Sequence, residues 1–240
     1  MRLGLFGGAF NPIHLCHLAT ARHIRDRLKL DRVLFIPTGD PPHKPADSLA
    51  PASHRCAMIK LAIAPEPTFA LSEIELTRTA KSYSIDTVRQ LKAELGQAAD
   101  LFFLVGLDAF LELPTWKDAN TLLALCHFVV VSRPPSHFAQ VGAMSLLPPL
   151  PETALREIDK GERPLLEIAL KGATRLMLLA LPPCPISASD VRERLRRRLP
   201  TANLLPTPVE SYILQHHLYQ EGSDRTDVEG ESPGHRTSGA

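Results

Sequence analysis

Residues 6–17 of this chain read Phe6-Gly7-Gly8-Ala9-Phe10-Asn11-Pro12-Ile13-His14-Leu15-Cys16-His17. The stretch follows a short apolar run and leads into a helical pattern, which is the strand–turn–helix entry of a nucleotide-binding α/β sheet. Two consecutive glycines let the backbone turn sharply and approach a ligand closely, and the helix that follows presents N–H groups to the turn. We therefore expect an anion at this turn.

His14 and His17 are three residues apart, so in a helix both imidazoles lie on one face of its first turn. There they would present two hydrogen-bond donors to a phosphate. From the residues alone, a tight turn with two packing histidines stays open, and so does a His-x-Cys-His zinc site. Zinc is disfavoured because its ligands would crowd one helix start, and no second Cys/His cluster completes a tetrahedron.

Length and composition indicate one soluble globular domain. The chain has 240 residues, of which 44% are hydrophobic and 22% charged, and its formal net charge is +1. This balance gives no reason to expect binding to nucleic acid or to a membrane surface. An anion site must therefore be a local feature.

The four cysteines are widely scattered, at Cys16, Cys56, Cys126 and Cys184. This spacing favours reduced thiols in a cytosolic protein over a disulfide framework. The N-terminal apolar run is too short for a signal peptide, and no stretch reaches the length of a membrane span. We expect a cytoplasmic protein.

Hydrophobic periodicity alternates between strand and helix along the chain. It predicts strands at residues 2–6, 32–36, 68–76, 101–105, 127–134 and 174–181. It predicts helices at residues 15–30, 52–64, 84–95 (with Ser84 as N-cap), 152–160, from 187 onward, and 208–219. The alternation indicates a doubly wound, Rossmann-like α/β domain: a mostly parallel sheet with helices on both faces.

Two regions stand apart from this pattern. Residues 135–171 contain several prolines and no recognisable chemistry, and we interpret them as an insertion over the sheet edge. Residues 220–240 have Val228 as their only sizeable aliphatic side chain, so they bury too little to offset the entropy of ordering. We predict one domain over residues 1–219 and a disordered C-terminal tail.

The stretch at residues 7–17 resembles the GG-[TA]-F-[DN]-P-[IV]-H-x-G-H signature of the nucleotidyltransferase superfamily. Later motifs resemble those of the nicotinate-nucleotide adenylyltransferases, and the resemblance covers nearly all of residues 1–219. Cys16 departs from the signature, which has glycine between the two histidines. We expect its side chain to turn into the core as a small buried thiol.

The resemblance implies an ATP site. Lys44, which alone would read as a surface lysine, follows Pro41-Pro42-His43 where the family has a triphosphate-binding basic residue. A segment from Ile186 to Arg192 is similar to the family's Ile-Ser-[SA]-[ST]-x-[IV]-Arg motif, although Ser187 with Asp190 also reads as a simple capping box. The residues assigned to ATP are Gly7, Gly8, Phe10, His14, His17, Lys44, Ile186, Ser187, Ser189 and Arg192.

The resemblance also implies a site for the acceptor mononucleotide. Ser-Tyr-[ST] in the family meets the pyridine carboxylate, Leu-Pro-x-Trp stacks an indole on the pyridine ring, and an Arg-Pro binds the phosphate. Alone, the serine reads as a helix cap and the single tryptophan as core packing. The residues assigned to the mononucleotide are Tyr83, Ser84, Gly106, Asp108, Trp116 and Arg133.

Together these motifs imply transfer of the adenylyl group from ATP to nicotinate mononucleotide, with His14, His17, Lys44 and Arg192 as catalytic residues. The expected products are deamido-NAD and pyrophosphate. We expect Mg²⁺ bound mainly through ATP phosphates, without dedicated protein ligands. A homo-oligomer stays open. Two alternatives are another adenylyl- or cytidylyltransferase, such as one acting on phosphopantetheine, and a nucleotide sensor without turnover, suggested by Cys16.

Overall fold

The computed structural model describes residues 1–39, 49–78, 81–96, 98–132 and 136–220. Its strands are β1 (Arg2–Gly8), β2 (Arg32–Pro37), β3 (Phe69–Leu71), β4 (Asp100–Gly106), β5 (His127–Val131), β6 (Leu165–Ala169) and β7 (Arg175–Leu179). Its α-helices are α1 (Leu15–Leu28), α2 (Ala52–Ile63), α3 (Ser84–Leu95), α4 (Leu107–Leu111), α5 (Ala119–Leu125), α6 (Glu152–Asp159), α7 (Ala188–Arg196) and α8 (Thr207–Gln215). Short 3-10 helices are η2 (Leu113–Thr115), η3 (Phe138–Ala143) and η4 (Lys171–Ala173).

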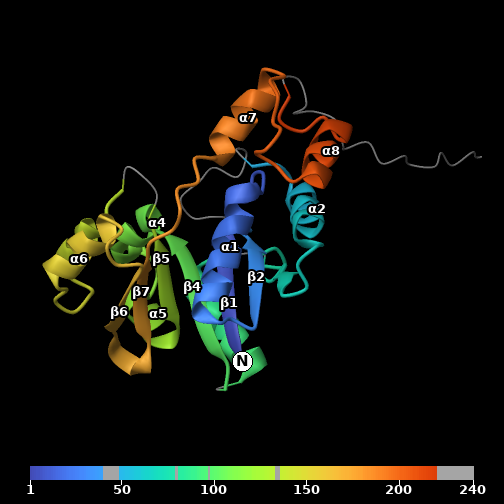
Figure 1. The fold of residues 1–240 in the computed structure, drawn as a ribbon. Coiled ribbons are helices and arrows are strands. Elements are labelled where there is room, and N and C mark those ends of the chain that lie inside the picture. The colour runs from blue at the N-terminus through green and yellow to red at the C-terminus, as the bar shows by residue number, and fades with distance from the viewer. Residues whose placement is uncertain (40–48, 79–80, 97, 133–135, 221–240) are drawn as a thin grey trace, which may run out of the picture.

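The strands form one sheet in the order β3-β2-β1-β4-β5-β7-β6 (Figure 1). All neighbouring pairs are parallel except β6 with β7, which is antiparallel. The order reverses direction between β1 and β4, so the crevice at their carboxyl ends is the switch point of a doubly wound sheet. The predicted fold class is confirmed.

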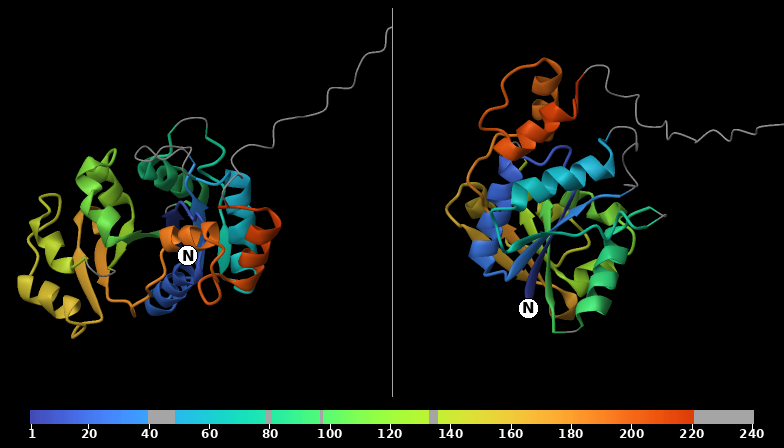
Figure 2. Two further views of the ribbon diagram at one scale, coloured as in Figure 1. Left: turned by 90° about the horizontal axis from the view of Figure 1, so that it is seen from above. Right: turned by 90° about the vertical axis from the view of Figure 1, so that its right-hand side faces the viewer.

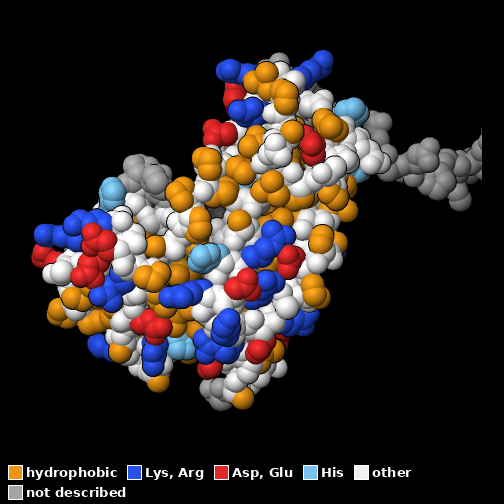
Figure 3. All heavy atoms as spheres, viewed as in Figure 1, with side chains coloured by type: hydrophobic (Ala, Val, Ile, Leu, Met, Phe, Trp, Pro, Cys, Tyr) orange, Lys and Arg blue, Asp and Glu red, His pale blue; other side chains and the backbone are white. Residues whose placement is uncertain are grey.

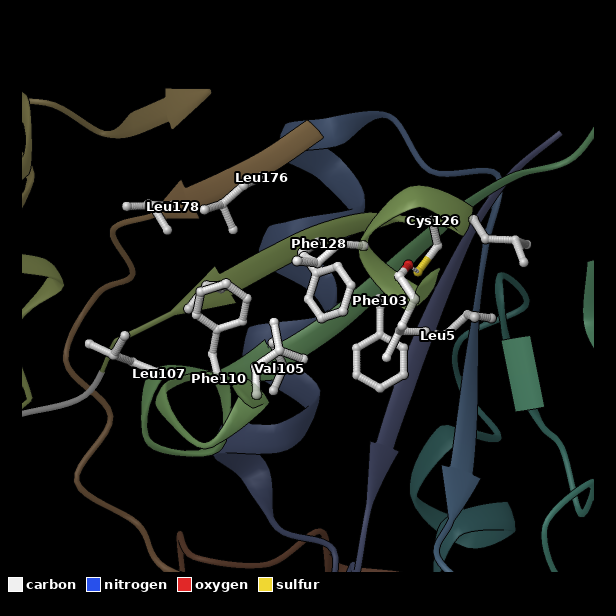
Figure 4. Close-up of a cluster of buried hydrophobic side chains, with 14 of the residues drawn as sticks. Leu5, Phe103, Val105, Leu107, Phe110, Cys126, Phe128, Leu176 and Leu178 are labelled. Carbon is white, nitrogen blue, oxygen red and sulfur yellow. Dashed lines mark hydrogen bonds between the residues drawn. The ribbon is translucent and has the colours of Figure 1, made fainter. Parts of the chain in front are cut away.

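Helices cover both faces of the sheet because its central strands are apolar on both sides. On one face, α3, α4, α5 and α6 pack against one core cluster. In it the rings of Phe103 and Phe128 lie 5.3 Å apart, and those of Phe110 and Phe128 lie 5.7 Å apart (Figure 4). On the other face, α1, α2, α7 and α8 share a second cluster. The sheet is therefore packed between two core clusters, which hold the ends of its strands in place.

Helices α7 and α8 lie beyond the carboxyl ends of the strands, above the start of α1 in the view of Figure 1, and Figure 2 shows the same arrangement from two further sides. Val191, Val209 and Ile213 are fully buried in the second core cluster. This packing brings a segment from the end of the chain next to the glycine-rich turn at its beginning.

Several predicted boundaries were wrong. Only Phe69–Leu71 of the predicted strand 68–76 pairs with β2, because the chain turns at Glu73, whose carbonyl accepts the N–H of Leu76. Tyr83, not Ser84, is the N-cap of α3. Strand β5 ends at Val131. Within 135–171 the helix at 152 was predicted, whereas edge strand β6 was not.

The described residues contain no helix long and apolar enough to cross a membrane. On the face drawn in Figure 3, basic and acidic side chains are interspersed. Of the predicted disordered tail, residues 220–240, all but Gln220 lie outside the described residues, as do Lys44 and Arg133.

Candidate active site

Two pockets adjoin at the carboxyl ends of the parallel strands. The first, of about 490 Å³, extends from the start of α1 past the ends of β5 and β7. The second, of about 610 Å³, lies between the ends of β1, β2 and β4 and the start of α3. Phe6 and Gly106 line both pockets. The two cavities therefore meet at the switch point of the sheet and could hold two ligands in contact.

The two histidines of the opening motif line the first pocket. His14 is the N-cap of α1, and its ring stacks on that of His17 with centroids 3.7 Å apart. The backbone N–H of His14 donates to Nδ1 of His17 at 3.2 Å. Since Nδ1 accepts, the proton of a neutral His17 sits on Nε2, and this N–H is the hydrogen-bond donor of the ring.

Gly7 and Gly106 leave open space at the floor of the cavities. A Cβ atom built on either residue would meet no protein atom within 4 Å. A side chain at these positions would therefore project into the space that a ligand needs rather than into the core. This agrees with the expectation that the backbone here approaches a ligand closely.

The glycine-rich turn is held from behind by Arg55, which is only 3% exposed. Its guanidinium donates to the carbonyl oxygens of Ala9 at 3.0 Å, Thr38 at 2.9 Å and Ala50 at 3.0 Å. Ala9 follows β1, Thr38 follows β2 and Ala50 precedes α2. One buried side chain from α2 thus joins three backbone segments, two of which border the second pocket.

The C-terminal part of the chain also contacts the opening motif. The Tyr219 hydroxyl donates to Oδ1 of Asn11 at 2.8 Å, and Arg192 donates to the carbonyl of Asn11 at 2.8 Å. The N–H of Leu15, at the start of α1, donates to the carbonyl of Leu204 at 3.0 Å. Burial raises the pKa of Tyr219, which keeps its phenol protonated as the donor.

The second pocket collects the residues predicted for the mononucleotide. Tyr83, Ser84, Gly106 and Trp116 all line it. Trp116 is half-buried, with its ring 6.0 Å from that of Phe103 at an interplanar angle of 73°. One side of the indole therefore packs on the core while the residue also borders the cavity, so the core and ligand readings of Trp116 are compatible.

Several charged residues that line the second pocket were missed from the sequence, among them Lys117 and Glu75. Lys117 lies 4.8 Å above the ring of Tyr83 and 3.0 Å from Asp86. Glu75 accepts a hydrogen bond from the Thr87 hydroxyl at 2.9 Å, and burial raises the pKa of its carboxyl group. Neither residue belongs to a periodic or glycine-rich motif, so no sequence signal distinguished them from surface charges.

Residues of the insertion complete the wall of the first pocket. Ser136, His137, Asp159 and Lys160 line it, together with the end of β7. The carboxylate of Asp159 accepts the backbone N–H groups of Phe138 at 2.6 Å and Ala139 at 3.0 Å, which ties α6 to η3. The interpretation of residues 135–171 as a segment without chemistry therefore overlooked part of the pocket. Its position after β5 was the available signal, since open sheets bind ligands at strand ends.

The cysteines overturn one expectation. Cys16 and Cys184 form a disulfide, with Cα atoms 5.8 Å apart, whereas Cys56 and Cys126 are free and buried. Cys16 is buried, as expected, but it is not a free thiol in the core. The prediction of four reduced thiols is wrong for this pair because the fold brings together residues separated by 168 positions.

Some predicted site residues lie outside the pocket walls. Phe10 is buried between Phe6, His17 and Phe35. Asp108 accepts a hydrogen bond from Ser136 and lines neither of the two pockets. The four residues predicted at the start of α7 also line neither pocket; they are Ile186, Ser187, Ser189 and Arg192.

The start of α7 nevertheless adjoins the site. The Ser187 hydroxyl accepts the N–H of Asp190 at 3.1 Å, which is the predicted N-cap. The guanidinium of Arg192 donates to the Ser189 hydroxyl at 3.3 Å, in addition to the carbonyl of Asn11.

Among the described residues, no group of three or more His, Cys, Asp or Glu side chains could hold a metal ion.

Comparison with known proteins agrees with this geometry. Residues 5–194 match the family described as cytidylyltransferase-like. A "Probable nicotinate-nucleotide adenylyltransferase" of Pelobacter propionicus is 41% identical over 221 residues, covering 92% of this chain and 99% of that protein. One of the same description from Geobacter metallireducens is 37% identical over 219 residues, covering 91% of this chain and 98% of that protein.

Solved structures share the fold. The chain resembles the Plasmodium falciparum nicotinic acid mononucleotide adenylyltransferase complexed with NaAD, with a TM-score of 0.66 and 17% identity. That similarity covers 91% of this chain and 97% of the other. At this identity the likeness concerns the fold alone.

Proposed function

This chain belongs to the nicotinate-nucleotide adenylyltransferases of the cytidylyltransferase-like family, and we propose that it transfers the adenylyl group of ATP to nicotinate mononucleotide. The observation that carries the proposal is the meeting of two pockets at Phe6 and Gly106. Each pocket has room for one nucleotide, and the reacting phosphates would lie where the pockets join. The products are deamido-NAD and pyrophosphate.

ATP would occupy the first pocket, with its α-phosphate beside His14 and His17. The hydrogen bond at Nδ1 of His17 supports a donor role for its Nε2. A donor fixed in this way stabilises the charge that grows on the phosphate oxygens as the α-phosphorus becomes five-coordinate. Stacking against His14 holds the ring in place before the substrate arrives.

Nicotinate mononucleotide would occupy the second pocket. The pyridine ring would stack on Trp116, and its carboxylate would meet the backbone and hydroxyl of Ser84 at the start of α3. Gly7 and Gly8 line this same pocket, so they would contact the mononucleotide side of the junction as well as the ATP phosphates. Tyr83 and Gly106 complete the wall.

The reaction needs no covalent enzyme intermediate. An oxygen of the mononucleotide 5′-phosphate attacks the α-phosphorus of ATP, a new P–O bond forms, and the bond to the β-phosphate oxygen breaks in line. Pyrophosphate leaves with the electron pair of that bond. Because the nucleophile is already an anion, the protein's contribution is to align the two phosphates and to neutralise charge.

Cations from two segments would hold the leaving group. Arg192 is anchored by Asn11 and Ser189 beside the first pocket, and we assign its remaining N–H groups to the β- and γ-phosphates. Ile186, Ser187 and the start of α7 would support the same phosphates. Lys44, Asp108 and Arg133 keep the roles that the family motifs imply, the first toward ATP and the others toward the mononucleotide.

Mg²⁺ fits this site as an ion carried by ATP. Since the described residues provide no cluster of three metal-binding side chains, phosphate oxygens and water would supply most of its ligands. Bound there, the ion would neutralise phosphate charge.

We place the reaction in the cytoplasm. The described residues that line both pockets come from one chain, so association of copies is not required to form these walls.

A purified-protein assay tests the proposal. Pyrophosphate release is measured with ATP and nicotinate mononucleotide, and separately with the amide mononucleotide and with phosphopantetheine. Release with nicotinate mononucleotide supports the proposal, and release with the amide mononucleotide alone would contradict the proposed acceptor. Release with phosphopantetheine instead would indicate the other transferase, and nucleotide binding without release would indicate a sensor.

A further inference from the structure

The disulfide between Cys16 and Cys184 lies within the wall of the first pocket. Cys16 stands in the first turn of α1 between His14 and His17. Cys184 belongs to residues 180–187, which connect the end of β7 to the N-cap of α7 and which we call the strap. The bond thus joins the two segments assigned to ATP, although 168 positions separate them.

The strap has few other fixed attachments. Within the described residues, no backbone–backbone hydrogen bond joins residues 181–186 to the rest of the chain. Leu181 and Ile186 pack against the second core cluster and are only partly buried. The disulfide is therefore the strong link between the strap and the first turn of α1. Without it, residues 181–186 are held by these two side chains and by the two ends of the strap, where the Ala180 N–H donates to the Pro164 carbonyl and Ser187 caps α7.

The strap also determines where α7 begins. Ser187, three residues after Cys184, is the N-cap of α7. Arg192 in that helix reaches the carbonyl of Asn11 in the opening motif. A covalent link at Cys184 thus reduces the conformations that the strap, the N-cap and Arg192 must lose when a triphosphate binds. Restricting a binding segment in its bound conformation increases affinity because less entropy is lost on association.

One sulfur of the pair is open to chemistry. Both cysteines line the first pocket, but Cys184 is half-buried whereas Cys16 is only 4% exposed. Since Cys184 is the more exposed residue of the pair, we take its Sγ as the atom that an incoming thiolate attacks. The free cysteines, Cys56 and Cys126, are buried elsewhere, and burial raises the pKa of both thiols, so they react slowly with disulfides or oxidants.

From this arrangement we propose that Cys16 and Cys184 form a reversible redox site, and that the oxidised pair strengthens ATP binding. The inference rests on the proposed binding of ATP in the first pocket. The reductant is a dithiol of the class that maintains cytosolic thiols. Its thiolate attacks Cys184 Sγ, the S–S bond breaks and Cys16 leaves as a thiolate, which takes a proton. The second thiol of the reductant then releases Cys184 as a thiol, so two electrons pass to the pair and the reductant becomes a disulfide.

The test compares ATP binding to the full chain with the pair oxidised and after treatment with dithiothreitol. ATP alone is titrated calorimetrically, since no turnover occurs without the acceptor, and nicotinate mononucleotide is titrated separately. Reduction should raise the Kd for ATP by roughly five- to tenfold, a usual size for coupling between sites, and leave that of the mononucleotide unchanged. Because coupling is reciprocal, saturating ATP should make the disulfide harder to reduce by the same factor.

Two variants identify the residues responsible. Cys184→Ser should bind ATP as weakly as the reduced wild type under both conditions. Cys126→Ala removes a buried thiol far from the strap and should keep the full response. Melting curves establish that each variant is folded, and the wild-type comparison does not depend on them. Thiol counting on the unreduced, unfolded wild type should give two thiols per chain.

Equal ATP affinity in the two redox states would overturn the inference while leaving the proposed function intact. A response that survives in Cys184→Ser, or four thiols in the unreduced wild type, would overturn it as well. Absence of ATP binding in both states would instead refute the proposed function, and the redox inference with it.

Discussion

The ring of His17 stacks on the ring of His14, with an interplanar angle of 28° and centroids 3.7 Å apart, and Nδ1 of His17 accepts a hydrogen bond from the backbone N–H of His14. Two contacts to one neighbour fix both the orientation and the tautomer of His17. The donor that would meet the α-phosphate is therefore positioned by the start of α1 itself.

Replacing His17 by alanine should lower kcat by about 10²-fold or more with a smaller change in KM, because a preorganised donor acts mainly in the transition state. Steady-state pyrophosphate release measures both constants. His23→Ala is the matched control, since His23 lies on the same helix and lines neither pocket. A His17→Ala enzyme with near-normal kcat would show that this histidine has a structural role.

Trp116→Ala should raise the KM for nicotinate mononucleotide by the equivalent of about 1–3 kcal/mol, the usual contribution of stacking a base on an aromatic ring. The KM for ATP should change little, because Trp116 borders only the second of the two pockets. Trp116→Phe retains a ring and should recover most of the affinity. An equal loss for both substrates would argue for core packing alone.

Gly106→Ala should leave the melting temperature nearly unchanged but weaken the binding of both substrates. The added Cβ meets no protein atom within 4 Å, and the glycine has an ordinary backbone conformation, with φ at −71°. The methyl group would instead occupy the space where the pockets meet. Thermal unfolding and the two KM values check this separation; a large fall in stability with normal KM values would contradict it.

Arg55→Lys should destabilise the fold by roughly 2–4 kcal/mol, because an ammonium group cannot reach three carbonyl oxygens and leaves buried acceptors unsatisfied. Urea unfolding at neutral pH measures the loss. Arg22→Lys is the control: its half-exposed guanidinium pairs with Glu66, and exposed pairs contribute about 1 kcal/mol or less. Similar losses of unfolding free energy in the two variants would show that the three hydrogen bonds of Arg55 stabilise the fold no more than an exposed ion pair does.

Glu75→Gln should raise stability at neutral pH. Burial raises the pKa of Glu75 above its ordinary 4.5, so the folded state binds the proton more tightly than the unfolded state. Wild-type stability therefore falls as pH rises from 4.5 through the raised pKa, and a neutral glutamine removes this fall. Unfolding free energies compared across pH should show the advantage of Glu75→Gln growing and then levelling off.

Glu73→Gln provides the comparison for that titration. Glu73 is an exposed neighbour that pairs with Lys60 at 3.0 Å on the surface. Its replacement should change the unfolding free energy at neutral pH by about 1 kcal/mol or less, because exposed ion pairs contribute little. If both substitutions change the profile equally, burial of Glu75 is not the cause.

Local signals in the sequence were sufficient for the fold class, although helices α4 and α5 and strand β6 were not predicted. A buried strand, two glycines and a helix start predicted the β1–α1 unit, and the apolar run 101–105 predicted the central strand β4. These elements are legible because hydrophobic periodicity and turn chemistry act over a few neighbouring residues. The predicted mononucleotide residues Ser84 and Trp116 do border one pocket. Ser84 stands at the start of a helix that periodicity predicted, whereas Trp116 was assigned from the family motif, because the elements on either side of it, η2 and α5, were not predicted.

Contacts between residues far apart in the chain could not be predicted from such local signals. The Cys16–Cys184 bond depends on how α1 and the strap pack, and spacing along the chain does not encode such packing. The sequence placed Arg55 in a predicted helix but did not indicate its role, because its three carbonyl partners are ordinary backbone groups. Glu75 likewise differs from other acidic residues only through burial that tertiary structure imposes.

The contacts of Asn11 with Arg192 and Tyr219 have a consequence for biosynthesis. Translation proceeds from the N-terminus, so the glycine-rich turn leaves the ribosome well before either partner exists. Until α7 and the segment after α8 have emerged, the turn lacks both bonds and the Leu15–Leu204 bond. The first motif to be synthesised is thus among the last to form all of its tertiary contacts. An unfinished chain carries the two histidines without the hydrogen bonds that hold the turn in position to act on ATP.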